Sequence, residues 1–122
     1  MKILLVDDSA VLLKMLKKSI QRIAEDRVRI ETCLSASEAE KILREEEYDL
    51  LVTDIVMPKK SGVELIRTIR KTDNNIKICV YSSLRDQETL DELDKLNISL
   101  LILKPGVVPE IAKKILDLVL IL

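Results

Sequence analysis

The chain has 122 residues, of which 48% are hydrophobic and 34% are charged, so we expect a single domain over residues 1–122 with a sizeable core. The charges nearly cancel, at a net charge of -1, which argues against direct binding of nucleic acid or anionic lipid. The apolar run before the first acids, residues 3–6, is too short for a signal peptide and no segment could span a bilayer, which predicts a cytoplasmic protein without membrane contact.

The N-terminal half predicts three strands separated by two helices. The first strand, residues 2–6, precedes a helical stripe formed by Leu12, Leu16, Ile20 and Ile23. The second strand, residues 28–33, leads into SASE (35–38), which has the form of a capping box at the start of a helix. The third strand covers residues 49–53 and, like the first, is apolar on both faces, as central parallel strands are.

The C-terminal half predicts two further strands and three helices. A second capping box, SGVE (61–64), starts a helix that precedes the fourth strand, residues 76–82. A third Ser-x-x-acid pattern, SLRD (83–86), predicts the start of a more polar helix at Ser83. After the fifth strand, residues 99–104, Pro109 fits the first turn of the last helix.

Strands that alternate with helices in this way favour an α/β fold with a parallel sheet covered on both faces. Five units suit an open, doubly wound sheet better than an eight-unit barrel. In such sheets ligands bind at the carboxyl ends of the strands. The polar residues at those ends are therefore the candidates for a functional site.

Charged and hydroxyl side chains follow four of the five predicted strands. They are Asp7 and Asp8 after the first strand, Asp54 after the third, Ser82 and Ser83 at the end of the fourth, and Lys104 at the end of the fifth. Three carboxylates beside one ammonium leave surplus negative charge, which a divalent cation would neutralise. Without histidine, the common zinc patterns and histidine-based catalytic pairs are excluded, so we expect oxygen ligands and Mg²⁺ first, then Mn²⁺ or Ca²⁺.

Four segments together resemble the receiver domain of two-component response regulators, of the chemotaxis-receiver type, over essentially the whole chain. They are VDDS (6–9), LLVTDIVMPKKSG (50–62), VYSS (80–83) and LKPG (103–106). The resemblance implies a flavodoxin-like sheet in the order 2-1-3-4-5. It also implies a signalling protein that a histidine kinase or a phosphotransfer protein phosphorylates on one aspartate.

The resemblance also implies the metal ligands. Asp8 and Asp54 would bind the ion through carboxylate oxygens, Asp7 through a bound water, and Val56 through its backbone carbonyl. Mg²⁺ prefers octahedral oxygen coordination and keeps several waters, one of which a phosphoryl oxygen can replace.

By the same resemblance, Asp54 is the phosphoacceptor, Lys104 pairs with one phosphoryl oxygen and the Ser82 hydroxyl binds another. A carboxylate can attack phosphorus to form an acyl phosphate, and this transfer depends mostly on positioning and charge neutralisation. The positions associated with water attack carry Val56 and Leu84, neither of which can hydrogen-bond a water. We therefore expect slow self-dephosphorylation and no catalytic turnover beyond it.

Some of these residues also have simpler explanations. Asp8 or Ser9 suits the N-cap of the first helix, and Lys104 with Pro105 suits an ordinary strand end.

The two cysteines are not expected to form a disulfide. Cys33 and Cys79 lie on the second and fourth predicted strands, roughly 14 Å apart at the usual sheet spacing, which is too far for a disulfide. Both are expected to be buried as small apolar residues.

The residue at position 101 departs from the family pattern, and two alternative functions remain open. Leu101 stands where receivers usually carry Tyr or Phe, which keeps open a phosphorylation-independent pseudo-receiver. An Asp-nucleophile phosphatase is a further alternative, although little chain is left to form a substrate pocket.

The last segment has apolar residues on more than one helical face, among them Leu116 and Leu122. This pattern favours a homodimer through the fourth helix, fifth strand and fifth helix, or contact with a further domain.

Overall fold

The computed structural model describes residues 1–84 and 86–120, and within them a five-stranded parallel sheet in the order β2-β1-β3-β4-β5. The predicted strand order and the doubly wound fold are therefore confirmed. The elements are β1 (Lys2–Val6), α1 (Ala10–Ala24), the short η1 (Glu25–Arg27), β2 (Arg29–Cys33), α2 (Ala36–Glu45), β3 (Leu50–Thr53), α3 (Gly62–Thr72), β4 (Lys77–Ser82), α4 (Gln87–Lys95), β5 (Leu100–Leu103) and α5 (Val108–Leu116). All five strands lie within one residue of their predicted bounds.

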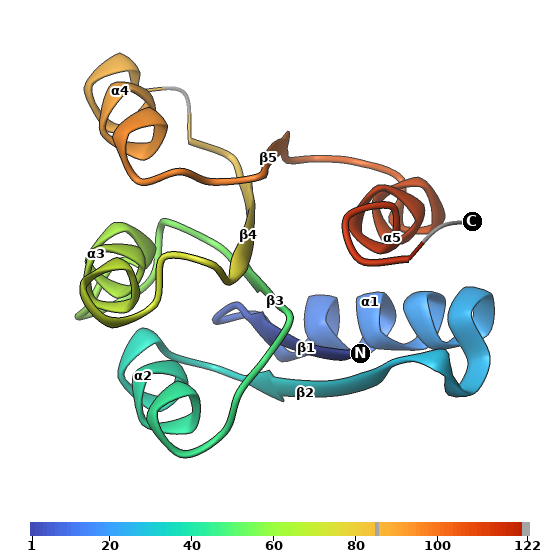
Figure 1. Cartoon of the computed structure of the whole chain (residues 1–122). Coiled ribbons are helices and arrows are strands. Elements are labelled where there is room, and N and C mark those ends of the chain that lie inside the picture. The colour runs from blue at the N-terminus through green and yellow to red at the C-terminus, as the bar shows by residue number, and fades with distance from the viewer. Residues whose placement is uncertain (85, 121–122) are drawn as a thin grey trace.

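Helices cover both faces of the sheet. Helices α1 and α5 lie on one face, and α2, α3 and α4 lie on the other (Figure 1). Because successive strand residues point to opposite faces, Ile3 and Leu5 of β1 pack towards α1 and α5, whereas Leu4 and Val6 pack towards α2 and α3. This double burial explains why the first and third strands are apolar on both faces.

Hydroxyl side chains start the first three helices as the sequence predicts. Ser9, Ser35 and Ser61 each accept a hydrogen bond from a backbone N–H in the first turn of the helix that follows. Pro109 lies in the first turn of α5, where its missing N–H costs no helical hydrogen bond. The choice left open between Asp8 and Ser9 as the first cap is thus resolved for Ser9.

The start of the fourth helix differs from its prediction at Ser83. Helix α4 begins at Gln87, and Asp86 is its N-cap, with a carboxylate that accepts hydrogen bonds from the Thr89 N–H and hydroxyl. Arg85, inside the predicted motif, lies outside the described residues. Both Ser83 and Asp86 suit the N-cap of this helix by their residue type. The structure uses Asp86, whose carboxylate binds two donors in the first turn.

The apolar residues at the end of α5 and after it pack against the chain's own core. Leu116 is fully buried, and Leu118, Val119 and Leu120 pack against the cluster between the sheet and helices α1 and α5. Ile121 and Leu122 lie outside the described residues. Among the described residues, part of the apolar surface that the sequence assigns to a partner is therefore covered within one chain.

Two further expectations can be compared with the described residues. Cys33 and Cys79 are free and buried, as predicted. Among residues 1–84 and 86–120, no helix combines the length and the apolar character needed to cross a bilayer.

Candidate functional site

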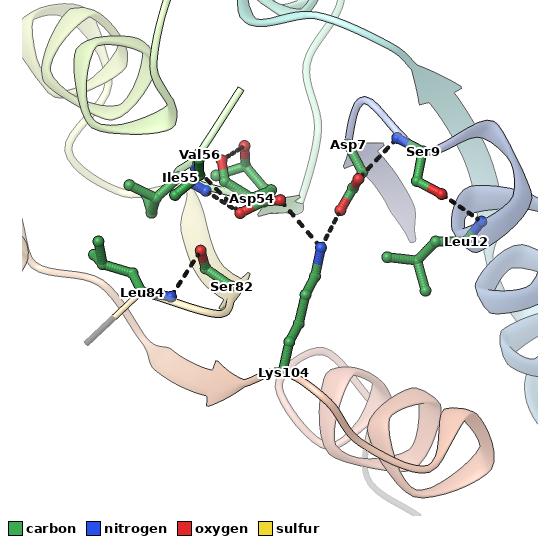
Figure 2. A network of polar contacts seen from close by, with 10 residues as sticks. Asp7, Ser9, Leu12, Asp54, Ile55, Val56, Ser82, Leu84 and Lys104 are labelled. Atoms are coloured by element: carbon green, nitrogen blue, oxygen red, sulfur yellow. Dashed lines mark hydrogen bonds and ion pairs between the residues drawn. The ribbon is translucent and has the colours of Figure 1, made fainter. Parts of the chain in front are cut away.

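The site lies at the carboxyl edge of the sheet, where the chain leaves β1, β3, β4 and β5. Val6 of β1 pairs in register with Thr53 of β3, so the residues that follow them, Asp7 and Asp54, leave the sheet side by side. Lys104 follows β5, on the far side of β4. Its side chain reaches back across β4 and ends between the two carboxylates (Figure 2).

Asp7 is held at both of its carboxylate oxygens. Its Oδ1 accepts a hydrogen bond from the Ser9 N–H at 2.9 Å, and its Oδ2 accepts one from Lys104 Nζ at 2.8 Å. The residue is only 4% exposed. The bond from Ser9 comes from the residue that caps α1, so the start of this helix also orients the carboxylate.

Asp54 is fixed in a similar way but from its own loop. Its Oδ1 accepts hydrogen bonds from the N–H groups of Ile55 and Val56, at 2.7 Å and 3.1 Å, and its Oδ2 accepts one from Lys104 Nζ at 3.0 Å. These bonds orient the carboxylate, although Asp54 lies in an almost completely buried position.

Burial and neighbouring charges shift the pKa values of two residues of the site. Burial raises the pKa of Asp7; hydrogen bonds from Lys104 and Ser9 oppose this rise without cancelling it, and the charge of Asp54 adds to it. Burial by itself would lower the pKa of Lys104, but the hydrogen bonds to Asp7 and Asp54 outweigh it and raise the pKa. The lysine therefore remains an ammonium, while the carboxylate of Asp7 still lacks enough positive charge around it.

Asp8 completes a group of three acids at this edge. Asp7, Asp8 and Asp54 each offer a carboxylate oxygen within 4.8 Å of the others, and Asp8 is exposed to solvent. All these donors are oxygen, the ligand type that hard divalent cations prefer. One ammonium offsets only one of three negative charges, so the donor set and its charge fit a divalent metal ion.

The remaining predicted residues lie around this group. Val56 follows Asp54 by two residues, is 58% exposed, and donates its N–H to the Asp54 carboxylate. Ser82 is fully buried at the end of β4, and its hydroxyl oxygen accepts a hydrogen bond from the Leu84 N–H at 3.4 Å. Figure 2 shows Ser82 and Asp54 at neighbouring strand ends. Each predicted site residue thus lies at one edge of the sheet.

Gly62 allows the loop that carries Asp54 to pack tightly. Its N–H donates to the Ile55 carbonyl at 3.0 Å. A Cβ atom on Gly62 would lie 2.1 Å from the Asp54 backbone oxygen and 2.9 Å from the Ile55 Cα. The start of α3 can therefore approach the backbone of Asp54 only with a glycine at this position.

One residue beside the site was not singled out from the sequence. The ring centroid of Tyr81 lies 5.2 Å from Lys104 Nζ, on the face covered by α1 and α5. The sequence signal was an aromatic residue directly before Ser82, inside the VYSS segment. Leu101, at the position where an aromatic residue was expected, packs partly buried on the opposite face.

The sequence is similar to one protein family over almost its whole length. The response regulator receiver domain family matches residues 3–116. Chemotaxis protein CheY from Thermotoga maritima is 33% identical over 104 residues, which are 85% of each chain.

Other relatives are longer proteins. The chain covers 39% of the response regulator DctR of Bacillus subtilis and 26% of a protein-glutamate methylesterase/protein-glutamine glutaminase of a Nocardioides species, each 30% identical to it. The chain therefore spans less than half of the length of these two relatives.

Solved structures show the same arrangement. The response regulator TrrA of Thermotoga maritima, in complex with Mg²⁺ and BeF, superposes with a TM-score of 0.81 at 28% identity, over 97% of this chain and 98% of TrrA. The receiver domain of HemR from Leptospira biflexa gives a TM-score of 0.84 at 28% identity, over 99% of this chain and 95% of that domain.

Proposed function

This chain belongs to the response regulator receiver family of two-component signalling, and from that premise we propose that Asp54 is its phosphoacceptor. The observation that supports this most is the double anchoring of Asp54: two backbone N–H groups bind Oδ1 and Lys104 binds Oδ2. Such an orientation holds a carboxylate ready for attack, and transfer of this kind is catalysed mainly by positioning. The protein would accordingly serve as a signalling switch.

The phosphodonor would be a phosphohistidine on a histidine kinase or a phosphotransfer protein. A carboxylate oxygen of Asp54 attacks the phosphorus, the P–N bond breaks, and the electron pair leaves with the imidazole nitrogen, which takes up a proton. The product is an acyl phosphate on Asp54. Lys104 then pairs with one phosphoryl oxygen and the Ser82 hydroxyl donates to another, so both neutralise charge that the transfer brings to this edge.

A divalent cation supplies the remaining charge neutralisation when bound, and Mg²⁺ fits best, with Mn²⁺ or Ca²⁺ as substitutes. Asp8 and Asp54 would hold it directly, Asp7 through a water and Val56 through its backbone carbonyl. Support comes from the three carboxylates within 4.8 Å of one another and from the burial that raises the pKa of Asp7 despite Lys104. TrrA, solved with Mg²⁺ and BeF, is consistent with this assignment.

Loss of the phosphoryl group should be slow. Val56 follows Asp54 by two residues and Leu84 follows Ser82 by two, and neither side chain can orient a water for attack. A phosphoryl lifetime of seconds in the absence of a phosphatase would contradict this.

We further propose that residues 1–122 form one receiver domain in the cytoplasm that binds no nucleic acid itself, consistent with its near-zero net charge. A homodimer would use α4, β5 and α5. β5 lies at the edge of the sheet, and Leu103 on it is 43% exposed, which leaves apolar surface for such a contact.

The test is incubation with acetyl phosphate and Mg²⁺, followed by intact mass spectrometry. We expect a gain of one phosphoryl group that is absent from Asp54→Asn and from protein treated with EDTA. Asp49→Asn is the matched control, because Asp49 binds the Lys2 N–H at the opposite end of the sheet and its loss should leave the gain unchanged. Equal phosphorylation of Asp54→Asn would overturn the assignment, and no gain in the wild type would favour a pseudo-receiver.

A further inference from the structure

Tyr81 lies beside the ammonium group that the site depends on. Its ring centroid is 5.2 Å from Lys104 Nζ, and the residue is 5% exposed. A cation within about 6 Å of an aromatic ring is attracted by the electrons of the ring face, most strongly where water is excluded. The chain has only two tyrosines and no Phe or Trp, so an aromatic ring at this place is a specific feature of the sequence.

Lys104 needs support because it acts far from its own strand. It follows β5, whereas its partners follow β1 and β3, and β4 lies between them. A lysine stem has four rotatable bonds, and holding it in one conformation costs side-chain entropy. Tyr81 comes from β4, the strand between Lys104 and its partners, and its ring lies beside the ammonium at the end of the stem.

Tyr81 also forms part of the inner wall of the site. A cavity of about 10 Å³ is lined by Asp7, Asp54, Tyr81 and residues of β1, β3 and α1. Only about one water fits a cavity of this size. The ring itself is almost completely buried, so little water competes on its side of the contact with the lysine, and the attraction is stronger there than at an exposed site.

We propose that Tyr81 is a positioning residue that holds the Lys104 ammonium in place for the phosphoryl group. This rests on the proposed role of Asp54 as phosphoacceptor. When a phosphoryl group forms on Asp54, Lys104 exchanges a carboxylate partner for a phosphoryl oxygen, while the ring stays in place beside it. Loss of the ring should therefore weaken binding of a phosphoryl group or its analogue at this site.

Two substitutions separate the ring from the rest of the side chain. Tyr81→Phe keeps the ring, and Tyr81→Leu removes it. We expect Tyr81→Leu to lower the rate of phosphorylation by acetyl phosphate and the affinity for beryllofluoride, followed by ¹⁹F NMR with Mg²⁺, by roughly fivefold, and Tyr81→Phe to stay within about twofold of the wild type. Equal losses in both variants, or no loss in Tyr81→Leu, would overturn the proposal.

The chain provides a matched control at the other end of the sheet. Tyr48 is also buried, at 8% exposure, and its ring centroid lies 4.7 Å from Lys2 Nζ. Tyr48→Leu removes a buried ring and a cation contact of the same kind, so it should reduce stability comparably. A similar drop in beryllofluoride affinity in Tyr48→Leu would show that general destabilisation explains the effect, which would contradict the proposal.

A double substitution tests whether Tyr81 acts through Lys104. In a Lys104→Ala background, Tyr81→Leu should not lower the beryllofluoride affinity further, whereas additive losses would contradict the proposal. If Tyr81→Leu does not fold, phenylalanine analogues with increasing fluorination at position 81 provide a second test. They keep the shape of the ring but make its face less negative, which weakens the attraction of a cation. Affinity should fall stepwise with fluorination, and a constant affinity would overturn the proposal.

The two proposals fail in different ways. A wild type that takes no phosphoryl group from acetyl phosphate and Mg²⁺ overturns the role of Asp54. A wild type that is phosphorylated on Asp54, with a rate that does not depend on the ring at position 81, overturns only the role of Tyr81.

Discussion

Gly62→Ala should disturb the loop of the phosphoacceptor more than its small size suggests. Gly62 starts α3, and the Cβ of an alanine there would lie 2.1 Å from the Asp54 backbone oxygen and 2.9 Å from the Ile55 Cα. Both of these atoms belong to the backbone, which cannot rotate away as a side chain can. The loop between β3 and α3 must move instead.

The size of the effect follows from these distances. The contact with the Asp54 oxygen is short by about 1 Å relative to ordinary van der Waals separation. Overpacking of this kind typically costs about 1–3 kcal/mol, and we expect the upper part of that range because the neighbour is backbone. The higher helix propensity of alanine stabilises the fold by only a few tenths of a kcal/mol to about 1 kcal/mol at this position. The free energy of unfolding should therefore fall by roughly 2 kcal/mol.

Urea unfolding followed by circular dichroism measures this loss directly. Gly106→Ala is the matched control, since the nearest atom to its Cβ is the Ile111 Cδ1 at 2.8 Å, the end of a flexible side chain that can rotate away. We expect a loss below about 1 kcal/mol there. Because Asp54 moves with the loop, Gly62→Ala should also be phosphorylated more slowly by acetyl phosphate. Equal unfolding midpoints for Gly62→Ala and the wild type would refute the reasoning.

Three further predictions concern other parts of the molecule. Arg70 donates to the carbonyls of Leu96 and Asn97 at 2.8 Å and 2.9 Å, so Arg70→Ala should lower the free energy of unfolding by about 1 kcal/mol and speed amide exchange in α4, and unchanged exchange would contradict this. Burial raises the pKa of Cys33 and Cys79 to about 12, so their native thiols stay protonated at pH 8 and should react with Ellman's reagent far more slowly than in urea, with a rate that rises with pH; rapid native labelling would count against it. Mg²⁺ at a hundredfold excess over its Kd should stabilise the fold by about 2.7 kcal/mol, measured as a rise in Tm that EDTA reverses and that Asp8→Asn largely removes, whereas a Tm that does not depend on Mg²⁺ would argue against the metal site.

Much of the site could be predicted because it depends on topology. The carboxyl ends of parallel strands meet at one edge of the sheet, so residues that follow buried strands can be placed together from their order in the chain. Asp7 and Asp54 follow neighbouring strands, and their contact with Lys104 results from this rule. The capping residues Ser35 and Ser61 could be predicted as well, because their partners lie within one helical turn.

The N-cap of α4 and the burial of Leu116 were predicted wrongly, and the contact of Tyr81 was not predicted. These features depend on packing between distant segments or on competition between local signals. Ser83 and Asp86 both suit an N-cap, and the spacing alone does not show which of them the backbone uses. Leu116 was assigned to a partner surface because it lies on a different helical face from the other apolar residues, whereas in the structure it is fully buried at the end of α5, and the turn that follows packs the next apolar residues against the same core. Tyr81 was overlooked because its contact with Lys104 depends on the path of a long side chain across β4.

The most direct test of the central claim identifies the residue that carries the phosphoryl group. Protein phosphorylated with acetyl phosphate and Mg²⁺ is treated with borohydride, which reduces an acyl phosphate to an alcohol, and the digested peptides are sequenced by mass spectrometry. We predict homoserine at position 54 and unmodified Asp7 and Asp8. Homoserine at position 7 or 8 instead, or a phosphate that survives borohydride on Ser82, would contradict the account.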